Sequence, residues 1–136
     1  MPLSLEVAEK MADAAKAKAV ETGCTVSVAV VDNAGYVLTV SRMDGALPLT
    51  AEAAINMAYT AAMFGAEGAK IVTMVPKPWF QSMVISTDGK IVPAEGEMPI
   101  KIGGELVGGI GAAGGSAEQD VACCVAALEA LKNNFR

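Results

Sequence analysis

The chain has 136 residues, a formal net charge of −5, and a hydrophobic content of 53%. This length predicts a single domain, residues 1–136, with a sizeable core. The acidic balance and the lack of a Lys/Arg cluster argue against nucleic-acid binding, which depends on neutralising phosphates. No apolar run reaches transmembrane length and the N-terminus has no signal-peptide pattern, so we expect no membrane insertion.

The numbers of cysteines and histidines limit the kinds of catalytic site and metal site that the chain can form. The chain has three cysteines, two of them adjacent (Cys123 and Cys124), and no histidine. An odd number of cysteines is a poor disulfide framework, so we expect a reducing, cytoplasmic setting. The absence of histidine excludes Ser-His-Asp and Cys-His catalysis, as well as zinc or haem held by histidine. We assign no metal site.

The first part of the chain predicts a helix and a hairpin. Ser4 caps a helix that runs to about Thr22, where a glycine follows. Residues 25–31 are β-branched on both faces, which is typical of a central strand. The turn at 32–35 leads into a returning strand at 36–42.

The middle of the chain predicts mainly helix. Residues 51–64 form a helix rich in small residues, and a short helix covers 66–74. Residues 75–80 read as a proline-stiffened loop that holds the aromatic pair Trp79-Phe80. Such a pair suits a lid or a subunit contact, and we favour the contact. The low aromatic content (4%) and the Ala- and Gly-rich layers also favour a homo-oligomer.

The last third predicts three strands and a helix. Strands are expected at 90–93, at 100–102 and, after a glycine turn, at 106–113. Ser116 and Gln119 form a capping-box pattern that starts a final helix, 116–133. Short connections between most strands favour an α+β fold with a five-stranded antiparallel sheet, in the order α-ββ-α-βββ-α, flanked by helices in two to three layers.

Two stretches could bind an anion. The glycine turn Gly114-Gly115 before the last helix directs several backbone N–H groups at one spot, which suits a carboxylate or phosphate. Arg42, at the end of a strand, can present its guanidinium to a carboxylate, and Asp44 begins the following loop. An Arg42–Asp44 ion pair is the alternative. The nearby match to G-x-G-x-x-G is rejected as a dinucleotide site, because no second strand follows the helix.

Two carboxylates are candidates for acid–base chemistry. Glu95 and Glu97 lie in a glycine-flanked loop, and two carboxyl groups in one site would raise one pKa. A solvated acidic turn is the alternative.

Several stretches follow one another along nearly the whole chain. They are residues 29–35 (AVVDNAG), 42–46 (RMDGA), 58–62 (AYTAA) with Phe64-Gly65, Met98-Pro99-Ile100, and 107–111 (VGGIG) with Gly114-Gly115 and Glu118-Gln119-Asp120. Together, and in this order, they resemble the GlcG/HbpS-like family. The resemblance implies a profilin-like fold, and a family that includes haem-binding proteins, a domain attached to corrinoid adenosyltransferases, and proteins encoded among genes of glycolate and diol utilisation.

The chain departs from the family pattern at two places. Met57 stands where the family usually has a lysine, three residues before Thr60. Residues 95–97, Glu-Gly-Glu, stand where the family usually has a run of glycines. A haem ligand here would have to be Met, Cys or Tyr. These changes indicate a specialised branch with its own ligand or reaction.

The sequence leaves three functions open. The first is an oligomeric auxiliary protein of small-molecule catabolism that binds an organic acid, haem or corrinoid near Arg42, Asp44, Met57, Thr60 and the Gly114-Gly115 turn. The second is a small isomerase, lyase or hydratase, with Glu95 or Glu97 as acid or base and Arg42 as the carboxylate anchor. The third is an assembly partner that uses Trp79-Phe80.

Overall fold

The computed structural model describes residues 2–134, which form a four-stranded antiparallel sheet with helices on both faces. The elements in chain order are α1 (Leu5–Thr22), β1 (Ser27–Asp32), β2 (Val37–Arg42), α2 (Leu49–Phe64), α3 (Gly68–Ile71), the 3-10 turn η1 (Val72–Met74), α4 (Pro78–Ser86), β3 (Glu97–Ile102), β4 (Glu105–Ala113) and α5 (Ala117–Asn134). The mixed α+β class, the antiparallel pairing and the first and last helices are confirmed.

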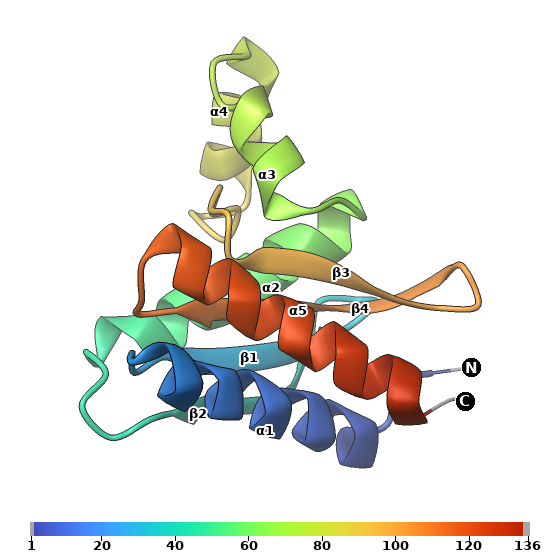
Figure 1. The fold of residues 1–136 in the computed structure, drawn as a ribbon. Coiled ribbons are helices and arrows are strands. Elements are labelled where there is room, and N and C mark those ends of the chain that lie inside the picture. The colour runs from blue at the N-terminus through green and yellow to red at the C-terminus, as the bar shows by residue number, and fades with distance from the viewer. Residues whose placement is uncertain (1, 135–136) are drawn as a thin grey trace.

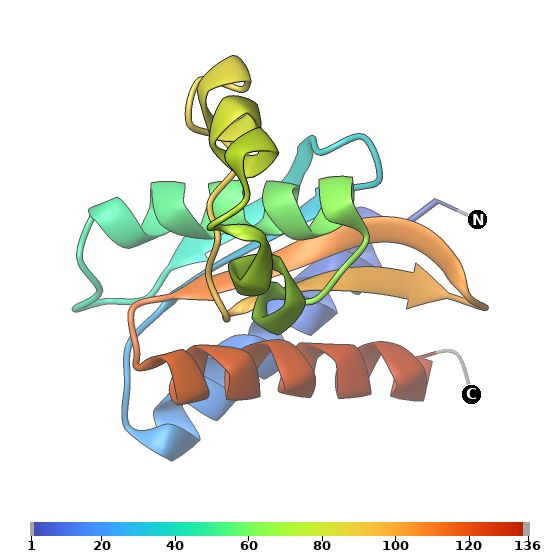
Figure 2. The ribbon, with the colours of Figure 1, turned by 90° about the horizontal axis from the view of Figure 1, so that it is seen from above.

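The sheet has the strand order β2-β1-β4-β3 and separates two helical layers. Helices α1 and α5 lie side by side on one face, and α2 lies on the other (Figures 1 and 2). The segment from α3 to α4 projects beyond the β3 edge of the sheet (Figure 1). We call residues 68–92 the arm. Within the described part of the chain, no helix is long and apolar enough to cross a membrane.

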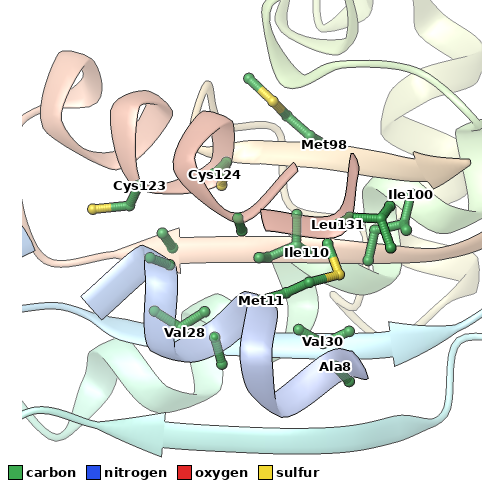
Figure 3. Close-up of a cluster of buried hydrophobic side chains, with 14 of the residues drawn as sticks. Ala8, Met11, Val28, Val30, Met98, Ile100, Ile110, Cys123, Cys124 and Leu131 are labelled. Carbon is green, nitrogen blue, oxygen red and sulfur yellow. The ribbon is translucent and has the colours of Figure 1, made fainter. Parts of the chain in front are cut away.

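Strand β1 is buried on both faces, as its β-branched sequence predicts. Val28 and Val30 point toward α1 and α5, where they join the largest core cluster, together with Met11 and Ile110 (Figure 3). The alternate residues, Ala29 and Val31, point toward α2 and form a second cluster with its alanines. The two clusters follow directly from the alternation of side chains along a strand.

The predicted five-stranded sheet is wrong by one strand, because residues 90–93 form no strand. Two of their backbone groups are bound by a side chain of α2, and the N–H groups of Lys90 and Ile91 donate to Thr87, instead of to a neighbouring strand. The Thr60 hydroxyl accepts the N–H of Val92 at 2.8 Å and lies 3.3 Å from the Lys90 carbonyl oxygen. Pro93 has no N–H to offer a ladder. The backbone groups of this segment therefore have hydrogen-bond partners without pairing to the edge strand of the sheet.

The predicted loop over residues 75–80 is also wrong at its end. Pro78 begins helix α4, and proline suits the first turn of a helix because its missing N–H would have no partner there. The arm has a small core of its own, made of Ile71, Phe80 and Ile91. Phe80 also stacks on Phe64 at the end of α2, with ring centroids 5.9 Å apart.

Candidate functional site

The structure divides the predicted site residues into two groups. Arg42, Asp44, Gly114 and Gly115 lie at one end of the sheet, because Ser27 of β1 pairs with Arg42 on one side and with Ala113 on the other. Arg42 and Asp44 are exposed. The Arg42 Nη1 donates to the carbonyl oxygen of Ala46 at 3.2 Å. This hydrogen bond links the guanidinium to the loop that directly follows β2.

The start of α5 is the capping box that the sequence predicts. The Ser116 N–H donates to Gln119 Oε1 at 2.9 Å, and the Gln119 N–H donates to Ser116 Oγ at 3.2 Å. Next to it, the Gly115 N–H donates to Asp120 Oδ1 at 2.9 Å. Burial raises the pKa of Asp120, and the amides of Gly115 and Gly114 oppose that rise. The chain's own side chains therefore occupy amides that we expected to hold an external anion.

Met57 and Thr60 form the second group and are buried residues of α2. Met57 is buried in the cluster between α2 and the sheet, and its Cε lies near Gly96. Thr60 is fully buried, and its hydroxyl also lies 2.7 Å from the Asn56 carbonyl oxygen. Both side chains therefore have structural partners that explain their positions.

Glu95 and Glu97 lie in different environments. Glu95 is exposed in the loop before β3. Glu97 begins β3 opposite Gly111, faces α2, and has its Cγ beside Gly68 at the base of the arm. Its side chain is completely buried, and neither carboxyl oxygen has a hydrogen-bond partner among residues 2–134.

The environment of Glu97 determines its protonation. Burial raises the pKa of its carboxyl group from 4.5 to about 9, although the nearby Ala94 amide lowers it somewhat. Glu97 is thus a neutral acid at pH 7.

A hollow of about 350 Å³ lies between α2 and the arm. It is lined by Tyr59, Met63, Phe64, Trp79, Met83, Thr87 and Ile91. We call it the arm hollow. Met63 and Met83 expose 41% and 43% of their surface, and Trp79 exposes 46%. The Phe64 and Trp79 rings are 6.3 Å apart, centroid to centroid. The hollow is therefore an apolar, aromatic surface with two accessible thioethers.

Two other hollows flank it. One, of about 300 Å³, is lined by Ala34, Gly35, Tyr36, Ile55, Asn56, Tyr59 and Lys90. Another, of about 310 Å³, is lined by Gly65, Ala66, Glu67, Met98, Pro99, Lys101, Leu128, Leu131 and Lys132. The site residues named above, from Arg42 to Gly115, line none of these three hollows. Asn56 and Tyr59, which the sequence of α2 also suggested as pocket residues, line the second of them.

Sequence reasoning missed the two methionines of the arm hollow. The signal was present as a spacing of four residues, Tyr59 to Met63 on α2 and Trp79 to Met83 on α4, which places each pair on one helical face. It was hidden because residues 75–80 read as a loop, which leaves no helix to carry the second pair.

The chain is similar to known proteins over most of its length. A family described as haem-degrading HbpS-like proteins matches residues 3–129. A 15.0 kDa protein from the dhaT–dhaS intergenic region of Citrobacter freundii is 33% identical over 129 residues, which are 93% of this chain and 90% of that protein.

Solved structures agree with this match. A crystal structure of a PduOC–haem complex has a TM-score of 0.88 and 29% identity, and covers 96% of this chain and 95% of that one. A double mutant of Streptomyces reticuli HbpS has a TM-score of 0.84 and 32% identity, and covers 95% and 86%. The resemblance seen in the sequence motifs is therefore confirmed, and the chain belongs to the family of haem-degrading HbpS-like proteins.

Proposed function

We propose that this protein binds a tetrapyrrole, with haem as the first candidate, in the arm hollow. The observation that carries the proposal is the composition of that hollow: aromatic rings and aliphatic side chains around two half-exposed methionines. A flat macrocycle loses apolar surface to such walls and can stack on aromatic side chains. The haem complex of the similar PduOC structure supports the choice of ligand.

The residues of the hollow also fit the metal of a haem. Thioether sulfur and tyrosine oxygen are known ligands of haem iron, so Met63, Met83 or Tyr59 would hold the iron of a haem in this hollow. A bound haem would supply redox and oxygen chemistry. The protein's own part is to exclude water from one face of the macrocycle through Phe64 and Trp79, and to present a sulfur or a phenolate.

The test is a titration of the apo protein with hemin, followed by the Soret band. Met63→Leu and Met83→Leu keep the apolar volume and remove a sulfur, and Trp79→Ala removes a wall. We expect at least one thioether variant to shift the Soret maximum, and Trp79→Ala to weaken binding roughly 10-fold, which corresponds to about 1.4 kcal/mol. Met43→Leu is the matched control, because this methionine packs on the opposite side of the sheet.

The position of the site and the identity of the ligand can be contradicted separately. Unchanged spectra and affinity in all three variants would place the ligand outside the arm hollow. Failure of micromolar hemin to bind would remove haem, and the same titration with cobalamin then tests a corrinoid.

A second candidate function is proton-transfer catalysis on a small organic acid, favoured by the neutral, unpartnered carboxyl of Glu97. In this function Glu97 acts as the acid. Arg42 cannot anchor the same small substrate, because it lies on β2, at the opposite edge of the sheet from β3. Glu97→Gln should abolish proton exchange into 2-hydroxy and 2-oxo acids in D₂O, read by NMR, while Glu95→Gln serves as the exposed control. Equal exchange in the wild type and Glu97→Gln removes this candidate.

A homo-oligomer is part of the same proposal. Tyr36, Leu47 and Leu49 each expose 70% or more of their surface. Association of copies would cover these side chains. Light scattering after size-exclusion chromatography should give a multiple of 13.8 kDa, and a monomer at micromolar concentration would contradict it.

A further inference from the structure

Two cysteines that are far apart in the sequence meet where the end of α1 lies against the start of α5. Cys24 directly follows Gly23, the C-cap of α1, and its N–H donates to the Ala19 carbonyl oxygen at 2.9 Å. Cys123 is buried in the first half of α5. Cys24 packs against the core cluster that contains Cys123. Gln119, one helical turn before Cys123, is hydrogen-bonded to Thr22, two residues before Cys24, so the two thiols lie at the same contact between α1 and α5.

Neighbouring contacts hold this junction in place. The Gln119 side chain of α5 donates from Nε2 to the Thr22 carbonyl oxygen of α1 at 3.0 Å. The Thr22 Oγ1 lies 3.7 Å from the Cys24 Sγ. These contacts join Thr22, two residues before Cys24, to Gln119, four residues before Cys123. They hold the end of α1 against the start of α5 close to the two thiols.

Cys124 is not part of the pair. The sulfur atoms of Cys123 and Cys124 point in different directions (Figure 3). The Cys124 Sγ lies 3.3 Å from the Gly96 carbonyl oxygen, to which it donates, on the side of β3. The adjacent cysteines in the sequence therefore face different partners.

The two paired thiols differ in accessibility. Cys24 is half-buried, whereas Cys123 is fully buried. Burial, and then the neighbouring Cys24, raise the pKa of Cys123 to about 11, so Cys123 stays a thiol at neutral pH. Because Cys123 is fully buried and Cys24 is accessible, a small oxidant in solution meets Cys24 first.

We infer that Cys24 and Cys123 are a redox site that forms a reversible disulfide when the protein meets a hydroperoxide. The Cys24 thiolate attacks the terminal peroxide oxygen, which gives a Cys24 sulfenic acid and releases the alcohol, or water when the oxidant is hydrogen peroxide. The Cys123 sulfur then attacks the Cys24 sulfur, loses its proton and displaces water. In total, two thiols and one hydroperoxide give one disulfide, one alcohol and one water. A dithiol reverses the reaction by exchange.

The experiment uses the full chain, free of haem and reduced beforehand. It is treated with hydrogen peroxide, alkylated under denaturing conditions, and analysed as intact protein and as peptides by mass spectrometry. We expect a loss of about 2 Da before alkylation, one alkylated cysteine at position 124, a cross-linked peptide that joins Cys24 to Cys123, and full reversal by dithiothreitol.

Single variants separate this pair from the adjacent pair. Cys124→Ser should still form the cross-link, whereas Cys24→Ser and Cys123→Ser should not. If Cys123→Ser folds poorly, Cys24→Ser still tests the site, because position 24 lies at the edge of the core. A Cys123–Cys124 cross-link, or oxidation of Cys24 to a sulfinic acid without any disulfide, overturns the inference.

Discussion

Glu97 carries a carboxyl group that the fold keeps away from water and from any hydrogen-bond partner among residues 2–134. Folding therefore favours its protonated form, with a folded pKa of about 9 against an ordinary value of 4.5. Since the folded pKa lies above the unfolded one, the contribution of this group to stability is fully present below pH 4.5. It is lost as the pH rises through 9.

Glu97→Gln should remove this pH dependence. By pH 7 the wild type has lost about 3 kcal/mol of unfolding free energy through this group, at about 1.4 kcal/mol per pH unit. The variant minus wild-type difference in unfolding free energy should therefore grow from pH 5 to pH 9, as measured by urea denaturation. Glu95→Gln, at an exposed position, should show no such growth. A constant difference for Glu97→Gln would mean that the carboxyl ionises in the folded protein.

At the scale of elements, β4 and α2 pack so closely that only glycine fits at two strand positions. A methyl group on Gly109 would collide with the Ala58 carbonyl oxygen, and one on Gly111 would collide with that of Ala54. The alanines of α2 complete this contact from the other side. The glycines of this strand therefore serve helix–sheet packing.

Gly109→Ala should lower the unfolding free energy by about 3 kcal/mol, because the close-packed backbone of α2 cannot move away without disturbing the sheet. Gly104→Ala is the control. A methyl group there meets nothing within 4 Å, so only the φ of 80° is unfavourable, at a cost of about 1–2 kcal/mol. Urea denaturation at one pH compares the two, and a smaller loss for Gly109→Ala than for Gly104→Ala would refute the packing argument.

Regular elements could be predicted wherever local signals and tertiary packing agree. The capping box at Ser116, the helix end at Gly23 and the two-faced strand β1 all carry their information within a few residues. The missing fifth strand could not be predicted in this way, because the Val92 N–H donates to the hydroxyl of Thr60, which is far away in the sequence.

The candidate site was less predictable than the fold. Arg42 and Gly114 were correctly read as ends of strands, but which ends meet depends on the strand order. The sequence predicted an external anion at the amides near Gly115, whereas the carboxylate that accepts from the Gly115 N–H is that of Asp120, five residues along the same chain. The arm hollow is formed by α2 and α4, and the sequence does not show that these two helices lie against each other.

On the scale of the whole molecule, the arm packs mainly on its own cluster and is attached to the body at a few points. They include the rings of Phe64 against Phe80 and Trp79, Gly68 against the backbone of Ala94, and Thr60 with the segment 90–92. A unit with a separate small core can open without the sheet.

Phe80→Ala should therefore unfold the arm locally. The substitution empties the centre of the arm's core, at a cost of roughly 3–5 kcal/mol, which we expect to fall on residues 68–92 alone. Hydrogen exchange should accelerate at least 100-fold in the arm and leave β1 and β4 nearly unchanged. Ile110→Ala, in the main core, should instead accelerate exchange throughout. A uniform acceleration in Phe80→Ala would show that arm and sheet unfold together.

The position of the chain ends has a mechanical consequence. Helix α1 begins and α5 finishes on the same side of the molecule, with Lys10 Nζ 3.5 Å from Asn134 Oδ1 (Figure 1). A force that pulls these two ends apart would act first on the contact between α1 and α5. The side-chain contacts between the two helices would break one after another, starting at the chain ends. The hydrogen bonds between β1 and β4 would bear no load until both helices had left the sheet. Tethered by its ends, this domain would be mechanically soft despite its central strands.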